Sequence, residues 1–421
     1  MARIDLPYGR RLLPIEIPDD YLGEVVAPPR IDTVVDPSAA IAAALASPIG
    51  CLRLAKMVQP KQKAVVIIDD ITRETPTRMM LPPVLEELAG AGVENENISI
   101  VIALGTHRPM TQAEIDKKIG PMIARDYRIV NVSARDAREM VYVGTSSLGI
   151  PACVNRFVAE ADIRVGIGMI APHLDAGFGG GAKIILPGVC SEETVAAFHA
   201  QMANINTNQL GVEEAALRLD LEKFVRECVK LDFILNAILD SNGDLYRCVA
   251  GDSIKAHRAG VRFALKAYGV TVKRRYPLVI VNAYPHWIDL WQTTKALASG
   301  ELLTEKGGML LLVADCPEGY GAHPLFAEYI GKDLDALLQQ FNGGQMKDQA
   351  AAAEAVAVCR MKRQIRIGLV SSGFSANEVR RMGFSHYRSV EEAIGHALQN
   401  MPEKKIGVIT HGGTTIPLLS H

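Results

Sequence analysis

The sequence predicts an α/β protein of two domains with mainly parallel sheets. Short β-branched runs alternate with longer segments of helical spacing, a pattern typical of parallel strands joined by helical crossovers. The pattern runs through residues 1–270 and starts again in residues 271–421. A chain of 421 residues also exceeds the length over which one hydrophobic core usually grows, so we expect more than one domain.

In the first domain, apolar runs predict parallel strands near residues 65–68, 99–104 and 163–171. Residues 81–92 have helical spacing, early prolines and a Gly-rich end, which predicts a helix between the first two strands. Further on, Asn242-Gly243 separates two apolar runs. Because Asn-Gly is typical of tight hairpin turns, we expect an antiparallel pair at the end of this domain.

The boundary between the domains is predicted between residues 270 and 271. The segment 271–276 is polar and basic, and a new apolar run follows it at Leu278. Further apolar runs begin at Met309, Ile365 and Lys405, so the alternation of strand and helix resumes. We expect the active site in the cleft between the two domains.

The composition argues against nucleic-acid and membrane roles. The formal net charge is only -2, which provides no basic stripe for phosphate backbones or anionic lipids. No apolar run reaches the roughly 20 residues of a membrane span. The 7 cysteines are scattered and form no C-x-x-C pair, which is typical of reduced thiols. We therefore expect a cytoplasmic protein.

Polar residues stand directly after several predicted strands. They are Asp69-Asp70-Ile71-Thr72-Arg73, Gly105-Thr106-His107-Arg108-Pro109, Pro172-His173 and His286. Ligands of open parallel sheets bind beyond the carboxyl ends of the strands, so the three stretches within residues 1–270 together predict a site in the first domain. Each alone is also explained as a turn or a helix cap.

A glycine-rich segment begins at Gly177, four residues after His173, and ends at a lysine. Its members are Gly177, Gly179, Gly180, Gly181 and Lys183. Glycines allow close approach of a backbone to a ligand and leave amides free to bind a phosphate. The segment is no phosphate-binding P-loop, because Ile184 follows the lysine in place of Ser or Thr. The alternative is a glycine-rich turn with a solvated lysine.

Two helical segments carry further candidates. His199 shares a helix face with Val195 and Phe198, where a packed histidine is the alternative to a metal ligand. In the second domain, Gln292 and Lys295 lie three residues apart and could bind a carboxylate. The two tryptophans, at positions 287 and 291, flank this pair and could line a pocket or pack in the core.

Taken in this order, these motifs resemble the nickel-dependent lactate racemase family. The resemblance rests on the strand-end stretches at 69–73 and 105–109, on His173 before the Lys183 loop, on His199, and on the Gln292 and Lys295 pair. It extends over roughly residues 65–315 and so includes both predicted domains.

The resemblance implies a nickel pincer nucleotide, a nicotinate-derived mononucleotide with sulfur-bound nickel, attached covalently to Lys183. It implies that His199 is the protein ligand of the metal, and soft sulfur with one imidazole suits square-planar nickel. Thr72 and the glycines of the Lys183 loop would contact the nucleotide. The cofactor would come from separate maturation proteins.

The same resemblance implies a racemase or epimerase of a small, lactate-like 2-hydroxy acid. His107 and His173 would be the two acid/base groups, one for each enantiomer, and imidazoles suit proton transfer in both directions. Arg73, Gln292 and Lys295 would hold the substrate, with Asp70 also in the catalytic site. Residues 1–270 would bind the cofactor, and residues 271–421 would contribute substrate contacts.

Some positions depart from the family pattern. Gly179 stands where many members have Ser, and Trp291 stands where Tyr is common. The substrate therefore stays open between lactate, malate, a longer aliphatic acid, an aromatic lactate and a sugar acid. A non-catalytic homologue that binds a nucleotide or another anion is the alternative from a different class. The sequence does not predict the oligomeric state.

Overall fold

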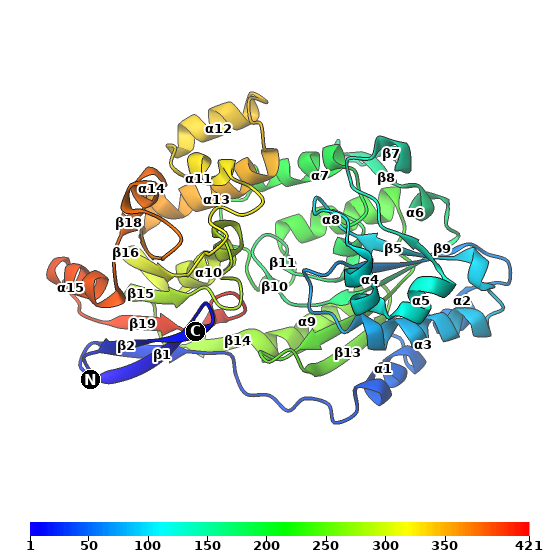
Figure 1. The fold of residues 1–421 in the computed structure, drawn as a ribbon, viewed down its shortest axis with the longest axis horizontal. Helices are drawn as coiled ribbons and strands as arrows, with labels where there is room; N and C mark the ends of the chain where they lie inside the picture. The colour runs from blue at the N-terminus through cyan, green and yellow to red at the C-terminus, as the bar shows by residue number, and fades with distance from the viewer. Residues whose placement is uncertain (421) are drawn as a thin grey trace.

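The computed structural model describes residues 1–420 and, within them, has two six-stranded sheets in two lobes (Figure 1). The first sheet has the order β13-β12-β9-β4-β5-β6 and is parallel except for β13, which is antiparallel to β12. Its strands are β4 (Ala64–Asp69), β5 (Ile98–Ala103), β6 (Arg128–Val130), β9 (Ile163–Met169), β12 (Phe233–Leu239) and β13 (Leu245–Gly251).

Helices and short hairpins complete the first lobe. Buried aliphatic side chains form a core on each face of the sheet, since alternate residues of β4 point to opposite sides. The helices are α1 (Pro37–Ala46), α2 (Leu54–Met57), α3 (Thr77–Gly90), α4 (Gln112–Ile119), α5 (Pro121–Asp126), α6 (Arg156–Glu160), α7 (Glu192–His199), α8 (Ala216–Cys228) and α9 (Lys255–Tyr268). The hairpins pair β7 (Met140–Thr145) with β8 (Pro151–Asn155), and β10 (Pro172–His173) with β11 (Gly177–Phe178).

The second sheet is parallel throughout and has the order β18-β17-β16-β15-β19-β3. Its strands are β3 (Leu22–Val26), β15 (Tyr276–Asn282), β16 (Thr304–Val313), β17 (Arg366–Val370), β18 (Ser385–His386) and β19 (Ile406–Ile409). Its helices are α10 (Leu290–Leu303), α11 (Leu325–Ile330), α12 (Leu334–Asn342), α13 (Gln349–Gln364), α14 (Ala376–Arg381) and α15 (Val390–Asn400).

The first 26 residues pack with the second lobe, although the predicted boundary grouped them with the first. β1 (Ala2–Tyr8) and β2 (Arg11–Ile17) form a hairpin whose Leu6 and Ile15 pack against strands β15 and β16. β3 then pairs with β19. The sequence around β3 could not predict its partner, because β3 and β19 lie near opposite ends of the chain. The division near residue 270 itself stays a prediction, although β14 (Gly269–Val272) pairs with β20 (Ile416–Leu419) beside it.

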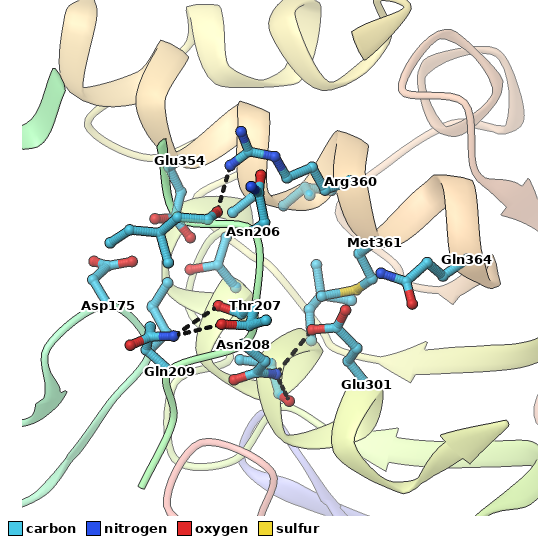
Figure 2. Close-up of a pocket in the computed structure, with 17 residues that line it drawn as sticks. Asp175, Asn206, Thr207, Asn208, Gln209, Glu301, Glu354, Arg360, Met361 and Gln364 are labelled. Carbon is cyan, nitrogen blue, oxygen red and sulfur yellow. Dashed lines mark hydrogen bonds between the residues drawn. The ribbon is translucent and has the colours of Figure 1, made fainter. Parts of the chain in front are cut away.

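The predicted fold class is confirmed, and so is the hairpin at Asn242-Gly243, which joins β12 to β13. The two lobes contact each other where α13 lies beside α7 and residues 200–204 (Figure 1). Side-chain hydrogen bonds join the lobes here (Figure 2): Asn208 donates to the carbonyl of Ala298 at 2.7 Å and to the carboxylate of Glu301 at 2.8 Å, and Arg360 donates to the carbonyl of Ile205 at 2.5 Å. No helix within residues 1–420 has the length and apolar character to cross a membrane.

Candidate active site

Asp70 follows the carboxyl end of β4 and positions His107, one of the two predicted acid/base residues. Oδ2 of Asp70 lies 2.7 Å from Nδ1 of His107, which follows the neighbouring strand β5. Oδ1 of Asp70 accepts hydrogen bonds from the hydroxyl of Thr72 at 2.6 Å and from its backbone N–H at 3.1 Å. Burial raises the pKa of Asp70, but the contacts with His107 and Thr72 outweigh it and hold the pKa below its ordinary value. Asp70 is therefore a carboxylate that fixes the ring of His107.

A buried lysine supports the loop that carries Arg73. Lys118 comes from α4; its ammonium lies 2.8 Å from Oδ1 of Asp69 and donates to the carbonyl of Arg73, also at 2.8 Å. Its side chain is only 5% exposed, so this ion pair is largely removed from solvent. Such a cation, held between two fixed acceptors, orients the turn after β4. The guanidinium of Arg73 is left at the surface, where it donates to the Thr72 hydroxyl at 2.9 Å.

The second predicted acid/base residue, His173, lies on the hairpin that follows β9. Its Nδ1 accepts hydrogen bonds from the backbone N–H groups of Asp175 at 3.2 Å and Ala176 at 3.4 Å. Its Nε2 lies 3.1 Å from Nζ of Lys183. Burial and the charges of Lys183, Arg73 and Lys295 lower the pKa of His173 well below its ordinary value. The neutral form of the ring is therefore favoured.

The amine of Lys183 faces this neutral ring. Burial lowers the pKa of Lys183, and the charges of Arg218 and Arg73 act in the same direction, against the carboxylate of Asp175. A lysine in such surroundings has a larger fraction of its amine unprotonated near neutral pH. The unprotonated amine is the nucleophilic form, so Lys183 is suited to covalent attachment of an electrophilic group.

Three buried polar side chains hold the glycine-rich loop, and sequence reasoning missed all of them. Arg218 of α8 is fully buried and donates to the carbonyl oxygens of Gly180, at 3.1 Å, and of Phe178. His257 of α9 lies 2.9 Å from the carbonyl of Gly179, and Asn236 of β12 accepts from the N–H of Gly181 at 2.8 Å. A polar residue within an apolar strand, as in Phe233–Leu239, is the signal that could have revealed Asn236.

The glycines of this loop have distinct local reasons. Gly180 and Gly181 have φ values of +71° and +59°, in the left-handed region that favours glycine. At Gly177, a Cβ would meet the carbonyl oxygen of Val212 at 1.8 Å. The backbone of Gly177 is therefore shaped by a neighbouring segment, which explains this glycine without any ligand.

His199 is the last residue of α7 and has an unsatisfied nitrogen. Its Nδ1 is buried and has no hydrogen-bond partner in the described part of the chain. Burial, with the charges of Lys183 and His323, lowers the pKa of His199 to about 4, so the imidazole is neutral. A neutral imidazole with an unused lone pair is the form that binds transition metals. Within residues 1–420, no group of three or more His, Cys, Asp or Glu side chains is arranged to hold a metal.

The second lobe contributes Gln292 and Lys295 from α10, a helix capped by Asp289, whose carboxylate accepts from the N–H of Gln292 at 2.7 Å. Lys295 donates to Oε1 of Gln292 at 3.0 Å, which confirms that the two share a helix face. Burial, together with the nearby charge of Arg73, lowers the pKa of Lys295 to about 7. His286 lies close to the same two cations, and burial with their charges lowers its pKa well below the ordinary value.

Trp291 packs inside the second lobe. Its ring lies 4.1 Å from that of His323 and 5.3 Å from that of Phe326, centroid to centroid, and the contact with Phe326 is edge to face. Both tryptophans lie against the core of this lobe while remaining partly exposed. The packing alternative therefore explains the position of Trp291.

The structure brings residues from both lobes into one electrostatic neighbourhood. The charges of Arg73, Lys183 and Lys295 all act on His173, and Lys183 also acts on His199. The charge of Arg73 also acts on Asp70, which contacts His107. Neutral imidazoles beside several cations can bind a small carboxylate and exchange protons with it. The fold and site thus define a two-lobed α/β enzyme that acts on a small organic anion.

Comparison with known proteins narrows this class. Residues 8–211 match the family model of the lactate racemase N-terminal domain, and residues 276–416 match that of the lactate racemase C-terminal domain. The chain is 29% identical over 425 residues to the lactate racemase of Thermoanaerobacterium thermosaccharolyticum, with 99% of each chain covered. It is 27% identical over 420 residues to the lactate racemase of Lactiplantibacillus plantarum, with 98% of this chain and 99% of that one covered.

Solved structures agree with this assignment. The lactate racemase apoprotein of T. thermosaccharolyticum superposes with a TM-score of 0.87 at 28% identity, with 99% of this chain and 100% of that one covered. A Thermotoga maritima protein at 18% identity, with a TM-score of 0.69 and coverage of 91% and 98%, shares the fold. The chain belongs to the lactate racemase family and is therefore an isomerase.

Proposed function

We propose that this protein is a nickel-dependent racemase or epimerase of a small 2-hydroxy acid, with its cofactor attached to Lys183. The observation that carries the proposal is the 3.1 Å approach of the His173 Nε2 to the Lys183 amine. This distance supports a proton-transfer role for His173 beside a cofactor attached to Lys183, and the charge of Lys183 also acts on His199, whose Nδ1 is unused.

The residues present fit a nickel pincer nucleotide. Lys183 would hold it covalently, and His199 would supply one nitrogen ligand, with the remaining donors coming from the nucleotide itself. Thr72 and the loop glycines Gly179, Gly180 and Gly181 would lie along it. When bound, the cofactor would supply the hydride chemistry at C2 of the substrate, with a 2-oxo acid as the intermediate form of the substrate.

The protein would supply the proton transfers. His107 or His173 would take the proton of the C2 hydroxyl, and the other histidine would return a proton to the oxo group on the opposite face. The Asp70 carboxylate, 2.7 Å from Nδ1 of His107, stabilises the imidazolium that forms when Nε2 accepts the proton. One histidine on each side allows both enantiomers to react.

The carboxylate of the substrate would bind to residues of both lobes. Arg73 offers a planar guanidinium, and Lys295 and Gln292 offer a second set of donors from α10. Because these groups come from different lobes, the substrate would lie in the cleft between them. A clamp of this kind fixes C2 and thereby orients its hydrogen for transfer.

We also expect the enzyme to act in the cytoplasm and to receive its cofactor from separate maturation proteins. The lowered pKa of Lys183 supports this chain as the acceptor in that step.

Racemisation in D₂O tests the proposed chemistry. Protein loaded with cofactor and nickel should convert L-lactate to the racemate, and NMR should find hydrogen retained at C2, because the hydride does not exchange with solvent. Deuterium at C2 would indicate deprotonation of carbon and would contradict the proposal. Absence of racemisation of lactate and of every other 2-hydroxy acid by loaded enzyme would also reject it.

A further inference from the structure

His286 follows the carboxyl end of β15 and takes no part in the proposed proton transfers. Its side chain is partly buried, and neither nitrogen of its ring has a hydrogen-bond partner among the residues that the structure describes. The nearby His411, by contrast, has its Nδ1 2.9 Å from the hydroxyl of Thr410. A partly buried imidazole without a protein partner leaves its donor and its acceptor free for a ligand.

The second sheet changes its winding direction beside this residue. β15 pairs with β16 on one side and with β19 on the other. Helix α10, which leads from β15 to β16, packs in the core that contains Val279 and Val281. Helix α15, which leads to β19, packs in the core on the other face, with Leu278 and Ile280. Ligands of open α/β sheets bind at the carboxyl ends of strands where the winding reverses, and His286 lies there.

Backbone groups of two loops hold His286 in place. Its N–H donates to the carbonyl of Ala283 at 2.8 Å, which closes a tight turn after β15. In the loop after β19, the N–H of Gly413 donates to the carbonyl of Tyr284 at 3.1 Å. A Cβ on Gly413 would lie 2.7 Å from Cδ2 of His286, so the backbone packs closely against the imidazole at this point. These contacts fix the position of the ring.

The imidazole lies near the two cations that would bind the substrate carboxylate. The charges of Lys295 and Arg73 both act on His286 and, together with burial, lower its pKa well below the ordinary value. Arg73 also lowers the pKa of Lys295, so the three groups, which come from both lobes, are mutual neighbours. A carboxylate bound between the two cations would relieve their repulsion and would have its oxygens close to a neutral imidazole.

We propose that His286 is a further substrate-binding residue, whose neutral ring donates a hydrogen bond to the substrate carboxylate held by Arg73 and Lys295. The inference rests on the proposed function and adds one contact to it. A neutral donor strengthens the binding of the carboxylate without a third positive charge beside His173. A third cation would make protonation of His173 less favourable and so would hinder its proposed proton transfer.

The alternative partner of His286 is the oxygen at C2, and kinetics distinguishes the two. The carboxylate keeps its charge throughout the reaction, so a contact with it is equal in the ground state and in the transition state. Its loss should raise KM and leave kcat unchanged. The oxygen at C2 changes its charge as its proton leaves, so loss of a contact there should lower kcat.

Substitution of His286 tests the contact. His286→Phe keeps an aromatic ring against Gly413 but removes both nitrogens. In enzyme that carries cofactor and nickel, KM for the best 2-hydroxy acid should rise about tenfold or more, with kcat within about threefold of the wild type. His286→Asn and His286→Gln place an amide near Nδ1 and near Nε2, and at least one of them should keep KM within about threefold. His386→Phe changes a partly buried histidine on β18, three strands from β15, and is the matched control.

Calorimetric titration with oxamate, an unreactive analogue of a 2-oxo acid, separates this inference from the proposed function. His286→Phe should raise the Kd of oxamate by the same factor as KM. Unchanged KM and Kd, a fall in kcat at constant KM, or equal rises in KM in the Phe, Asn and Gln variants would overturn the role of His286, while the proposed function would stand. If His286→Phe does not fold, His286→Ala takes its place.

A different result would reject the proposed function. If loaded wild-type enzyme racemises no 2-hydroxy acid, the oxamate titration decides the role of His286 alone. Weaker oxamate binding in His286→Phe than in the wild type would then support the carboxylate contact, and equal binding would overturn it.

Discussion

The two histidines at the carboxyl end of the first sheet have opposite surroundings. His107 is 41% exposed and places Nδ1 against the carboxylate of Asp70, whereas His173 is 20% exposed and accepts backbone hydrogen bonds at Nδ1. Several cations act on His173, whose Nδ1 also lies 3.8 Å from the carboxylate of Asp175, whereas the carboxylate of Asp70 contacts His107 directly. The strands before them, β5 and β9, flank β4 on either side.

Under the proposed function, one residue type would serve the two faces of the substrate through different neighbours. His107 has its donor nitrogen fixed by a carboxylate before any cofactor is present, so its Nε2 is ready to accept a proton. The Nε2 of His173 faces Lys183, so its hydrogen bonding changes once that amine is acylated. The asymmetry predicts that the two histidines respond differently to substitution of their partners.

The largest expected effect is loss of either histidine. His107→Ala and His173→Ala should each lower kcat by about 10²–10⁴-fold, because each removes the proton-transfer group for one face. Both variants should keep the melting temperature and cofactor content of the wild type to within small changes. A loss below about tenfold at both positions would contradict the assignment of the pair.

Removal of the buried arginine that holds the Lys183 loop should act mainly on stability. Arg218→Met leaves two buried loop carbonyls without their side-chain donor, while Glu222 keeps its two hydrogen bonds with Arg258, so the free energy of unfolding should fall by about 1–3 kcal/mol. The exposed Arg226 on the same helix gives the control, and Arg226→Met should stay within about 0.5 kcal/mol of the wild type. Denaturant unfolding measures the free energy of unfolding of both variants. Equal losses would show that Arg218 does not stabilise the Lys183 loop.

Asp70→Asn separates positioning from proton transfer. The amide still accepts a hydrogen bond from Nδ1 of His107 but cannot stabilise an imidazolium, so kcat should fall by about 10–100-fold. KM should change little, because Asp70 does not hold the substrate carboxylate. Steady-state kinetics of both enantiomers checks this expectation, and a rise in KM at constant kcat would place Asp70 in substrate binding.

The smallest effect concerns pH. Burial, with the nearby Arg73, lowers the pKa of Lys295 to about 7, so the free protein loses this positive charge as the pH rises through that value. Substrate carboxylates should then bind less well, and KM should rise by up to about tenfold per pH unit above the pKa. Acylation of Lys183 removes one neighbouring charge and so moves the onset to higher pH. Lys295→Arg stays charged and should flatten the profile; an equally steep profile would contradict this account.

Local patterns predicted most of the fold and part of the site. Strand and helix alternation follows from short-range periodicity, and Asn242-Gly243 identified its hairpin. The partner of β3 could not be predicted, since β19 lies more than 370 residues further along the chain. Arg218, Asn236 and His257 come from three separate elements and meet only at the loop carbonyls and amide, so no spacing revealed them. Trp291 was ambiguous because core packing and pocket lining share helical spacing.

Intact-protein mass spectrometry tests most directly whether Lys183 carries the cofactor. Chain produced together with cofactor maturation proteins should show one added nucleotide mass, located by peptide mapping at Lys183, with about one nickel per chain. Lys183→Ala should lack the added mass and the activity, and His199→Ala should keep the adduct but bind nickel weakly. Full racemase activity in a metal-free sample with unmodified Lys183 would contradict the account.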